Sequence, residues 1–174
     1  MIGKALISQV VVSLGLAVIY LKPNLIMSPT FCCKPFTDLN TLELYALLQL
    51  RSEVFVVEQN CVYQDVDGFD QDAYHVFALI DDQIVAYTRL LPPGAKYPEA
   101  SLGRVVSRAS ARGTGLGKQL MNTAIEYCDT LWSGLGITIS AQAYLEKFYQ
   151  DLGFKTQSAP YLEDDIPHIK MTRA

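Results

Sequence analysis

The chain has 174 residues, with 14 lysines and arginines against 18 aspartates and glutamates. This length suits one domain with a full hydrophobic core and is too short for two domains of ordinary size. The net charge of -4, with basic residues scattered along the chain, argues against nucleic-acid binding. The four cysteines lack the C-x-x-C spacing of a zinc site or redox motif, which favours reduced thiols of a cytoplasmic protein.

Residues 5–21 form an apolar run between Lys4 and Lys22, as in a signal peptide or a short membrane anchor. The run is shorter than the roughly 20 residues that span a bilayer, and no clean small-x-small cleavage site follows it. Met27 offers an alternative start. We therefore expect residues 1–26 to be an upstream extension or signal-like segment outside the fold, and residues 27–174 to form the domain. Membrane contact is expected only if residues 1–26 are retained as an anchor.

The chain after Met27 alternates between strand and helix patterns. Asn40 followed by Glu43 forms a capping-box pattern, and apolar residues at helical spacing predict a helix over 41–57. Further helices are expected from Leu116 and over 144–152. Strands are expected at 31–34, 75–80, 84–91, 102–107, 136–143, 154–157 and 166–171. This order predicts a single α+β domain with a sheet of mixed direction and helices on its faces.

The segment Arg112-Gly-Thr-Gly-Leu-Gly-Lys118 is a glycine-rich loop that leads directly into a helix. Backbone N–H groups at a helix N-terminus are unpaired and bind phosphate oxygens when no side chain crowds them. The loop is not a Walker motif, because Gln119 stands where a Ser or Thr is needed, and it lacks the dinucleotide spacing. Taken alone, it is either a phosphate-binding loop or a turn that starts a helix.

The pattern Arg-x-x-Gly-x-Gly resembles the pyrophosphate-binding motif of the GCN5-related N-acetyltransferase (GNAT) superfamily, whose donor is acetyl-coenzyme A. The Phe-Tyr pair and following Gly-Phe within 142–154 resemble the second signature of that superfamily. Other segments are similar to the ElaA family from the first helix to the C-terminus, among them Val54-Phe-Val-Val-Glu-Gln59, Gly103-Arg-Val-Val106 and Ile166-Pro-His-Ile169. The resemblance implies a GNAT-type mixed central sheet with helices on both faces.

The resemblance also implies roles for single residues. Val105 and Val106 would present backbone groups to the pantetheine arm and thioester, and Gln142 would reach that arm in place of the usual Asn. Tyr149 would protonate the departing thiolate, and its alternative is a core tyrosine with a backbone partner. The implied pyrophosphate-binding residues are Arg112, Gly113, Thr114, Gly115, Leu116, Gly117 and Lys118.

An ammonium group must lose a proton before it can attack a thioester, and the candidates for the base are Glu58, His75, His168 or a water chain. Glu58 follows the first helix, where the family builds its acceptor pocket, and partial burial would raise its pKa. Its alternative is a surface carboxylate or an ion pair with Arg51 or Arg89. His75 and His168 are equally compatible with structural roles.

Acidic residues gather in the aperiodic segment 59–74, where we expect a solvated loop. Their spacing around Gly68 does not match an EF-hand, so no metal site is expected. With residues 163–165 they would form an acidic rim that attracts a cationic amine. Asp165 stands where the family tends to carry glycine, and Asp tolerates a positive φ better than most residues.

The implied function is an acetyl-CoA-dependent N-acetyltransferase that transfers acetyl directly to an amine of a small molecule or peptide. Acetyl-CoA acts as co-substrate, and no metal is required. Two alternatives are a non-catalytic acyl-CoA-binding module and a related acyltransferase that uses longer acyl chains. The sequence determines neither the acceptor nor the oligomeric state.

Overall fold

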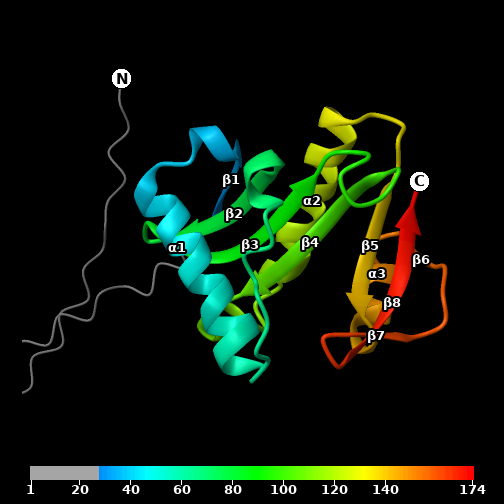
Figure 1. The fold of residues 1–174 in the computed structure, drawn as a ribbon. Helices are drawn as coiled ribbons and strands as arrows, with labels where there is room; N and C mark the ends of the chain where they lie inside the picture. Colours follow the sequence, from blue (N-terminus) through cyan, green and yellow to red (C-terminus); the bar gives the residue numbers. More distant parts are fainter. Residues whose placement is uncertain (1–27) are drawn as a thin grey trace, which may run out of the picture.

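The computed structural model describes residues 28–174, which form one eight-stranded sheet with helices on both faces (Figure 1). This confirms the predicted single-domain α+β fold. The expected extension at residues 1–26 lies outside the described residues. The strands are β1 (Thr30–Pro35), β2 (Tyr74–Ile80), β3 (Gln83–Leu91), β4 (Ala100–Ser107), β5 (Ile137–Gln142), β6 (Lys155–Thr156), β7 (Tyr161–Glu163) and β8 (Ile166–Arg173).

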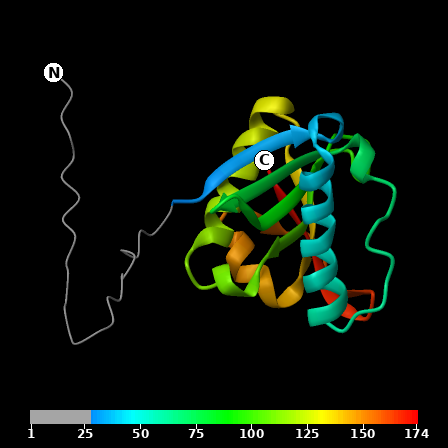
Figure 2. The same cartoon turned by 90° about the vertical axis from the view of Figure 1, so that its left-hand side faces the viewer.

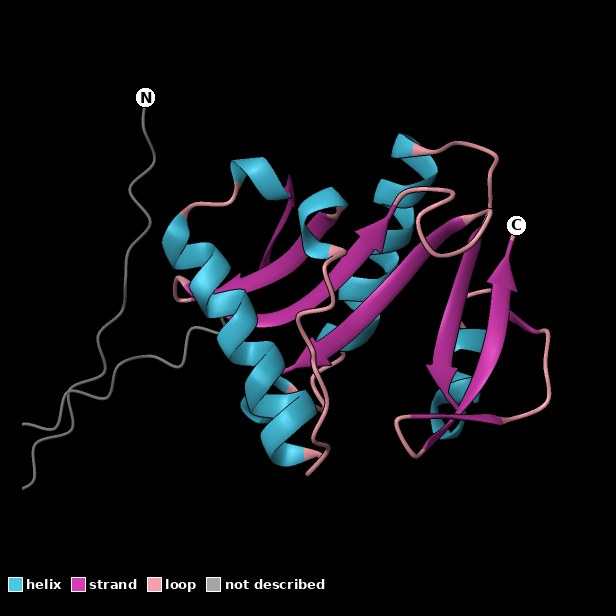
Figure 3. Ribbon diagram, in the orientation of Figure 1, coloured by secondary structure: helices cyan, strands magenta, loops and turns pink. Residues whose placement is uncertain are grey.

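The strand order is β1-β2-β3-β4-β5-β8-β6, and β7 pairs with β8 beside this path. Each of the recorded pairings is antiparallel except that of β4 with β5. Helix α2 (Leu116–Leu131) connects these two parallel strands, as a parallel connection requires a crossover. The parallel β4–β5 pair therefore makes this otherwise antiparallel sheet a mixed one (Figure 3).

Helix α1 (Thr41–Arg51) begins at the predicted capping box, in which the Glu43 N–H donates to Asn40 Oδ1 at 2.9 Å and the Asn40 N–H donates to Glu43 Oε2 at 3.0 Å. A π-helical turn (Ser52–Glu58) continues it, so the helix predicted over 41–57 is confirmed with wider winding at its end. Helix α3 (Glu146–Gln150) is the shortest α-helix in the described part of the chain. One-turn 3₁₀ helices lie at Phe36–Asp38, Asp70–Asp72, Ala109–Ala111 and Ala143–Leu145.

The two faces of the sheet carry separate hydrophobic clusters. On one face, α1 buries Leu47 and Leu50 against Phe77 and Tyr87 of β2 and β3. On the other face, α2 and α3 pack in a larger cluster against residues of β2 and β3 that point the opposite way, among them Val76, Ala78 and Leu90. The views in Figures 1 and 2 place α1 and α2 on opposite sides of the sheet. Burial of both faces therefore fixes the register of the central strands.

Two hairpins turn through pairs of aspartates with positive φ. Asp81 and Asp82 have φ of 51° and 59° between β2 and β3, while Asp164 and Asp165 have φ of 50° and 61° between β7 and β8. Such two-residue turns match the right-handed twist of the flanking strands. The positive φ considered for Asp165 is thus confirmed. The short strand β7 was not predicted.

The aspartate-rich loop before β2, residues 59–73 and called the aspartate loop below, is exposed over most of its length, but the expectation of a solvated loop is wrong for Asp65 and Asp70, which are buried. Arg51, only 1% exposed, donates from Nε to Asp65 Oδ2 at 2.8 Å and from Nη1 to Asp70 Oδ1 at 2.7 Å. Arg89 donates to Asp67 Oδ1 at 2.6 Å and to Asp70 Oδ1 at 2.9 Å. Buried carboxylates require such partners. The loop is therefore fastened to the sheet by paired charges, and these aspartates do not form a free acidic rim.

Candidate active site

Strands β4 and β5 pair only at Ala100–Ile137 and Ser101–Thr138, and then diverge (Figures 1 and 3). A cleft of about 430 Å³ opens along the divergence, with the end of the first helix on one side and β5, α3 and the β7–β8 turn on the other. Within residues 28–174, the edge of β4 that faces this cleft has no strand partner beyond Ser101. Backbone groups there are available to hydrogen-bond a ligand.

A β-bulge at Arg104 bends β4 beside the cleft. Tyr87 pairs with Val106 but Arg89 pairs with Gly103, so β4 holds one extra residue, and Arg104 has φ of 54°. Bulges bend a strand and re-aim its side chains. The Arg104 guanidinium pairs with Asp65 at 2.7 Å and Asp67 at 3.1 Å, which ties the strained backbone to the aspartate loop.

Sequence reasoning placed Val105 and Val106 on this strand but missed the bulge. A glycine inside a strand pattern, here Gly103, is the signal that indicates one. Val105 and Val106 line the cleft directly after the bulge. The bend therefore determines how their backbone groups face the cleft.

The glycine-rich loop presents unpaired backbone donors at the start of α2. Gly113 and Gly115 have φ of 75° and 84°, and Gly115 is the N-cap of the helix. The N–H groups of residues 113–117 have no hydrogen-bond acceptor among residues 28–174. A Cβ added at Gly117, which lines the cleft, would meet nothing within 4 Å. These donors and this open space fit a diphosphate group.

Glu58 and Arg112 form an ion pair at the mouth of the cleft. Arg112 Nη1 and Nη2 donate to Glu58 Oε1 and Oε2 at 2.5 and 2.9 Å, and Arg112 Nε donates to the Ser107 carbonyl at 3.0 Å. The hydrogen bond from Arg112 lowers the pKa of Glu58. The expectation of a raised pKa is therefore wrong for this arrangement, and the expected partner, Arg51 or Arg89, is replaced by Arg112.

Tyr149 combines a buried ring with an unpaired hydroxyl. Its ring packs edge-on against Phe148 and Phe154, with centroids 5.1 and 5.9 Å away. The side chain is only 5% exposed and lines the cleft, and its hydroxyl has no hydrogen-bond partner among residues 28–174. The alternative, a core tyrosine whose hydroxyl bonds a backbone group, is therefore not supported within residues 28–174. Burial raises the pKa of Tyr149, so the phenol stays protonated at neutral pH.

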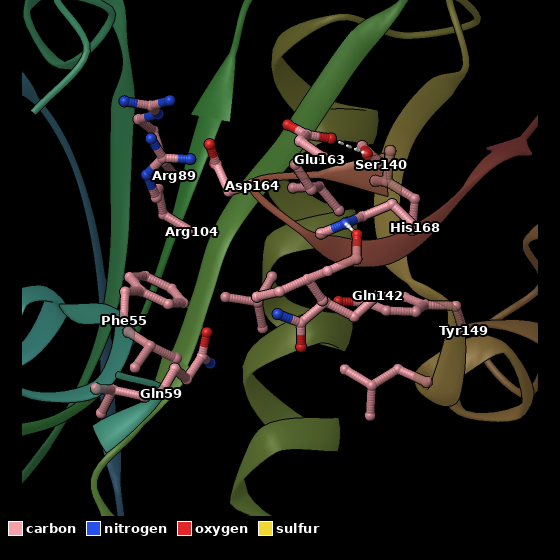
Figure 4. A pocket seen from close by; sticks show the side chains of 18 of the residues that line it. Phe55, Gln59, Arg89, Arg104, Ser140, Gln142, Tyr149, Glu163, Asp164 and His168 are labelled. Carbon is pink, nitrogen blue, oxygen red and sulfur yellow. Dashed lines mark hydrogen bonds between the residues drawn. The ribbon is translucent and has the colours of Figure 1, made fainter. Parts of the chain in front are cut away.

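The two histidines differ in position. His75 is 1% exposed, contacts the Tyr87 hydroxyl through Nδ1 at 2.9 Å and the Asp70 carbonyl through Nε2 at 3.0 Å, and does not line the cleft. His168, on β8, lies opposite Gln142 of β5 and lines the cleft. Its Nδ1 donates to the Ile166 carbonyl at 2.8 Å, which leaves Nε2 as the acceptor of the neutral ring. Figure 4 shows His168 and Gln142 beside Tyr149.

Ser140 and Glu163 line the wall of the cleft near His168 (Figure 4). The Ser140 hydroxyl donates to Glu163 Oε2 at 2.5 Å. Partial burial works to raise the pKa of Glu163, but the hydrogen bond from Ser140 and nearby Lys96 outweigh it, so the pKa is lowered. Glu163 is thus a carboxylate at neutral pH. Ser140 was not a predicted site residue, although it lies two positions before Gln142 on β5 and so on the same face of the strand.

The cleft brings together a large part of the predicted site: it is lined by Glu58, Val105, Val106, Arg112, Gly117, Gln142 and Tyr149. Gly113, Gly115 and Lys118 are exposed on the loop at its end. Leu116 belongs to the core, and Thr114 donates to the Ala111 carbonyl at 2.8 Å. These two therefore position the loop with their side chains and face any ligand only through their backbone.

Two further properties concern the same described residues. No helix within 28–174 is long and apolar enough to cross a membrane. In that part of the chain, no three His, Cys, Asp or Glu residues are grouped so that they could hold a metal ion.

Comparison with known proteins defines the class. The family model described as an acetyltransferase (GNAT) domain matches residues 41–174, so the chain belongs to the GNAT family. An acyl-CoA N-acyltransferase from Pseudomonas aeruginosa has a similar structure, with 50% identity, a TM-score of 0.81, and coverage of 84% of this chain and 100% of that one.

The chain is also similar to ElaA of Escherichia coli. The sequence of ElaA from strain K12 is 44% identical over 139 residues, which cover 79% of this chain and 91% of that protein. The crystal structure of E. coli ElaA matches with a TM-score of 0.80 at 40% identity, covering 84% of this chain and all of the other. The predicted resemblance to the ElaA family is thus confirmed.

Proposed function

We propose that this GNAT protein is an N-acetyltransferase that uses acetyl-CoA as donor and an amine as acceptor. The observation that carries the proposal is one continuous cleft, with unpaired N–H groups near one end and the free Tyr149 hydroxyl on its wall. The first feature suits a diphosphate and the second suits a leaving thiolate. The similar Pseudomonas protein, described as an acyl-CoA N-acyltransferase, supports the same donor class.

The donor would lie along the gap between β4 and β5. Its diphosphate would be held by the N–H groups of residues 113–117, with Arg112 and Lys118 supplying positive charge. Its pantetheine arm would pair with backbone groups of Val105 and Val106 on the unpartnered edge of β4. The Gln142 amide, on the opposite wall, would hydrogen-bond the same arm. The thioester then comes to lie beside Tyr149.

The reaction is a direct transfer. The deprotonated amine attacks the thioester carbonyl carbon, a C–N bond forms, and a backbone N–H of the β4 edge stabilises the oxyanion. The C–S bond then breaks and Tyr149 donates its proton to the departing thiolate. The nitrogen loses its remaining extra proton to a base or water, and the phenolate regains a proton from solvent. The products are an acetamide and free coenzyme A.

The base for the ammonium group is assigned to Glu58, on the condition that its pair with Arg112 opens. While the pair is closed, Arg112 lowers the pKa of Glu58 and makes it a weak base. His168, whose free Nε2 belongs to a cleft-lining ring, is the second candidate. A water chain is the third.

Two alternative functions have distinct consequences. A non-catalytic acyl-CoA-binding module would keep the loop but release no thiol. An enzyme for longer acyl chains would show higher kcat/KM with those donors than with acetyl-CoA.

We also place the enzyme in the cytoplasm, because Cys32, Cys33, Cys61 and Cys128 are all free thiols.

A panel of acceptors tests the proposal. Purified protein is mixed with acetyl-CoA and with polyamines, amino acids or peptide amines, and free thiol is measured over time. The proposal expects acceptor-dependent thiol release and an acetylated amine in the product mass spectrum. Binding of coenzyme A without thiol release for any acceptor would favour the binding module.

A further inference from the structure

Arg112 is the first residue of the glycine-rich loop, and Glu58 occupies the terminal nitrogens of its guanidinium. Both carboxylate oxygens accept from the two terminal nitrogens of the guanidinium, at 2.5 and 2.9 Å. The remaining nitrogen, Nε, donates to the Ser107 carbonyl at 3.0 Å. A guanidinium fork binds carboxylate and phosphate with the same two parallel hydrogen bonds. Glu58 therefore uses the donors that a phosphate group would use.

The pair is able to open. The side chains of Arg112 and Glu58 are 40% and 43% exposed, and ion pairs with that much contact to water are weak. Glu58 is also the last residue of the π-helical turn, next to the loop that begins at Gln59. Its side chain can therefore turn away without breaking the core.

A diphosphate arriving at the loop has advantages that Glu58 lacks. It carries more negative charge than one carboxylate, and it would also accept from the N–H groups of residues 113–117, which have no acceptor among residues 28–174. Two anions beside one guanidinium repel each other. Binding of the diphosphate and retention of the Glu58 contact therefore oppose each other.

We propose that the donor diphosphate displaces Glu58 from Arg112, so that donor binding releases a free carboxylate into the cleft. This inference rests on the proposed function, because it requires a coenzyme A diphosphate at the loop. Its consequence for catalysis is an ordered reaction. The carboxylate becomes a competent base only after the donor is in place, and loss of the Arg112 hydrogen bond removes the cause of its lowered pKa.

The test measures the affinity of coenzyme A by calorimetry for the wild type and for Glu58→Gln. Removal of the competing carboxylate is expected to tighten binding about two- to fivefold, the range expected for a half-exposed ion pair. The gain should shrink when salt is raised, because exposed charges are screened. If Glu58 instead supports Arg112 in binding the coenzyme, the variant binds more weakly, and that result overturns the inference.

Glu53→Gln is the matched control. Glu53 lies on the same π-helical turn, its side chain is also 43% exposed, and it pairs with Arg108 at 3.4 Å. Neutralising it removes a similar charge without touching Arg112, so the affinity is expected to change by less than about twofold. An equal gain in coenzyme A affinity in Glu53→Gln and Glu58→Gln would point to general electrostatics and contradict the displacement of Glu58 from Arg112.

A second background isolates the contact itself. In Arg112→Gln the competition no longer exists, so adding Glu58→Gln should leave coenzyme A affinity unchanged. A gain that persists in this background would overturn the inference. If the wild type binds coenzyme A and Glu58→Gln binds it no more tightly, the displacement of Glu58 is refuted while the proposed function is not. Failure of every variant to bind coenzyme A refutes the proposed function, and the exchange with it.

Discussion

Tyr149 is held in place by its ring, while its hydroxyl has no partner among residues 28–174. Tyr149→Phe keeps the packing and removes only the proton donor. Because general acid catalysis contributes about a hundredfold or more, turnover is expected to fall by that factor while coenzyme A affinity stays within about twofold. Thiol release and calorimetry measure the two quantities. Tyr127→Phe, on the part of α2 outside the cleft, is the control and should change neither.

Gly115 combines a backbone requirement with a role in the ligand site. Its φ of 84° disfavours any other residue, so Gly115→Ala is expected to cost about 1 kcal/mol of unfolding free energy. It should also weaken coenzyme A binding, because it alters the N-cap of α2. Gly134→Ala is matched to it, with φ of 77° and no atom within 4 Å of an added Cβ. The control should lose similar stability in urea unfolding and keep its affinity. Equal affinity loss in both would contradict a specific role for Gly115.

At the residue scale, the sequence predicted contacts within one segment and missed those between segments. The loop 112–118 could be assigned because a few consecutive residues form it. The partner of Glu58 could not, because Arg112 lies 54 positions away and no local pattern connects them. The same holds for Ser140 and Glu163, which only the β5–β8–β7 pairing brings together.

The aspartate loop carries a network of buried ion pairs outside the two hydrophobic clusters. Arg51 is buried and pairs with Asp65 and Asp70, so Arg51→Met removes one of the two arginines that pair with each of these buried carboxylates. Such a loss costs about 3–5 kcal/mol, measured as a lower free energy of unfolding in urea. Lys34→Met removes a partly exposed pair with Glu43 and should cost clearly less, because ion pairs in contact with water contribute little. Equal costs would show that the buried network is not special.

The same loop makes stability depend on pH. Burial works to raise the pKa of Asp67 and Asp70, but hydrogen bonds from Arg89 and Arg51 outweigh it and lower both pKa values. A carboxylate with a lowered folded pKa stabilises the fold above its unfolded pKa, about 3.9, and this stability is lost as pH falls toward the folded pKa. The urea midpoint should therefore decline below about pH 4.5. The decline should be shallower in Asp67→Asn, and an identical slope would contradict this account.

At the element scale, the sequence predicted the long helices and central strands but not their irregularities. Residues 41–57 show one helical period, which does not reveal that the turn Ser52–Glu58 winds as a π-helix. Strand β7 has three residues, too few to show alternation. The aspartate loop was misjudged because its composition is polar, while the arginines that bury it come from three other elements.

For the whole molecule, one geometric feature links fold and site. The sheet changes direction at the β4–β5 pair, separates after two residue pairs, and leaves a strand edge and a helix N-terminus facing one cleft. Composition and periodicity alone indicated a mixed sheet. Neither composition nor periodicity indicates where β4 separates from β5, because that point is set by contacts between segments far apart in the chain.

The central claim is that this cleft binds an acyl-CoA with its diphosphate at residues 113–117. Titration of coenzyme A into ¹⁵N-labelled protein, followed by amide NMR, tests it most directly. The account predicts the largest shifts for the amides of residues 113–117, and further shifts at Val105 and Val106. Saturable binding that shifts amides elsewhere and leaves 113–117 unchanged would contradict it.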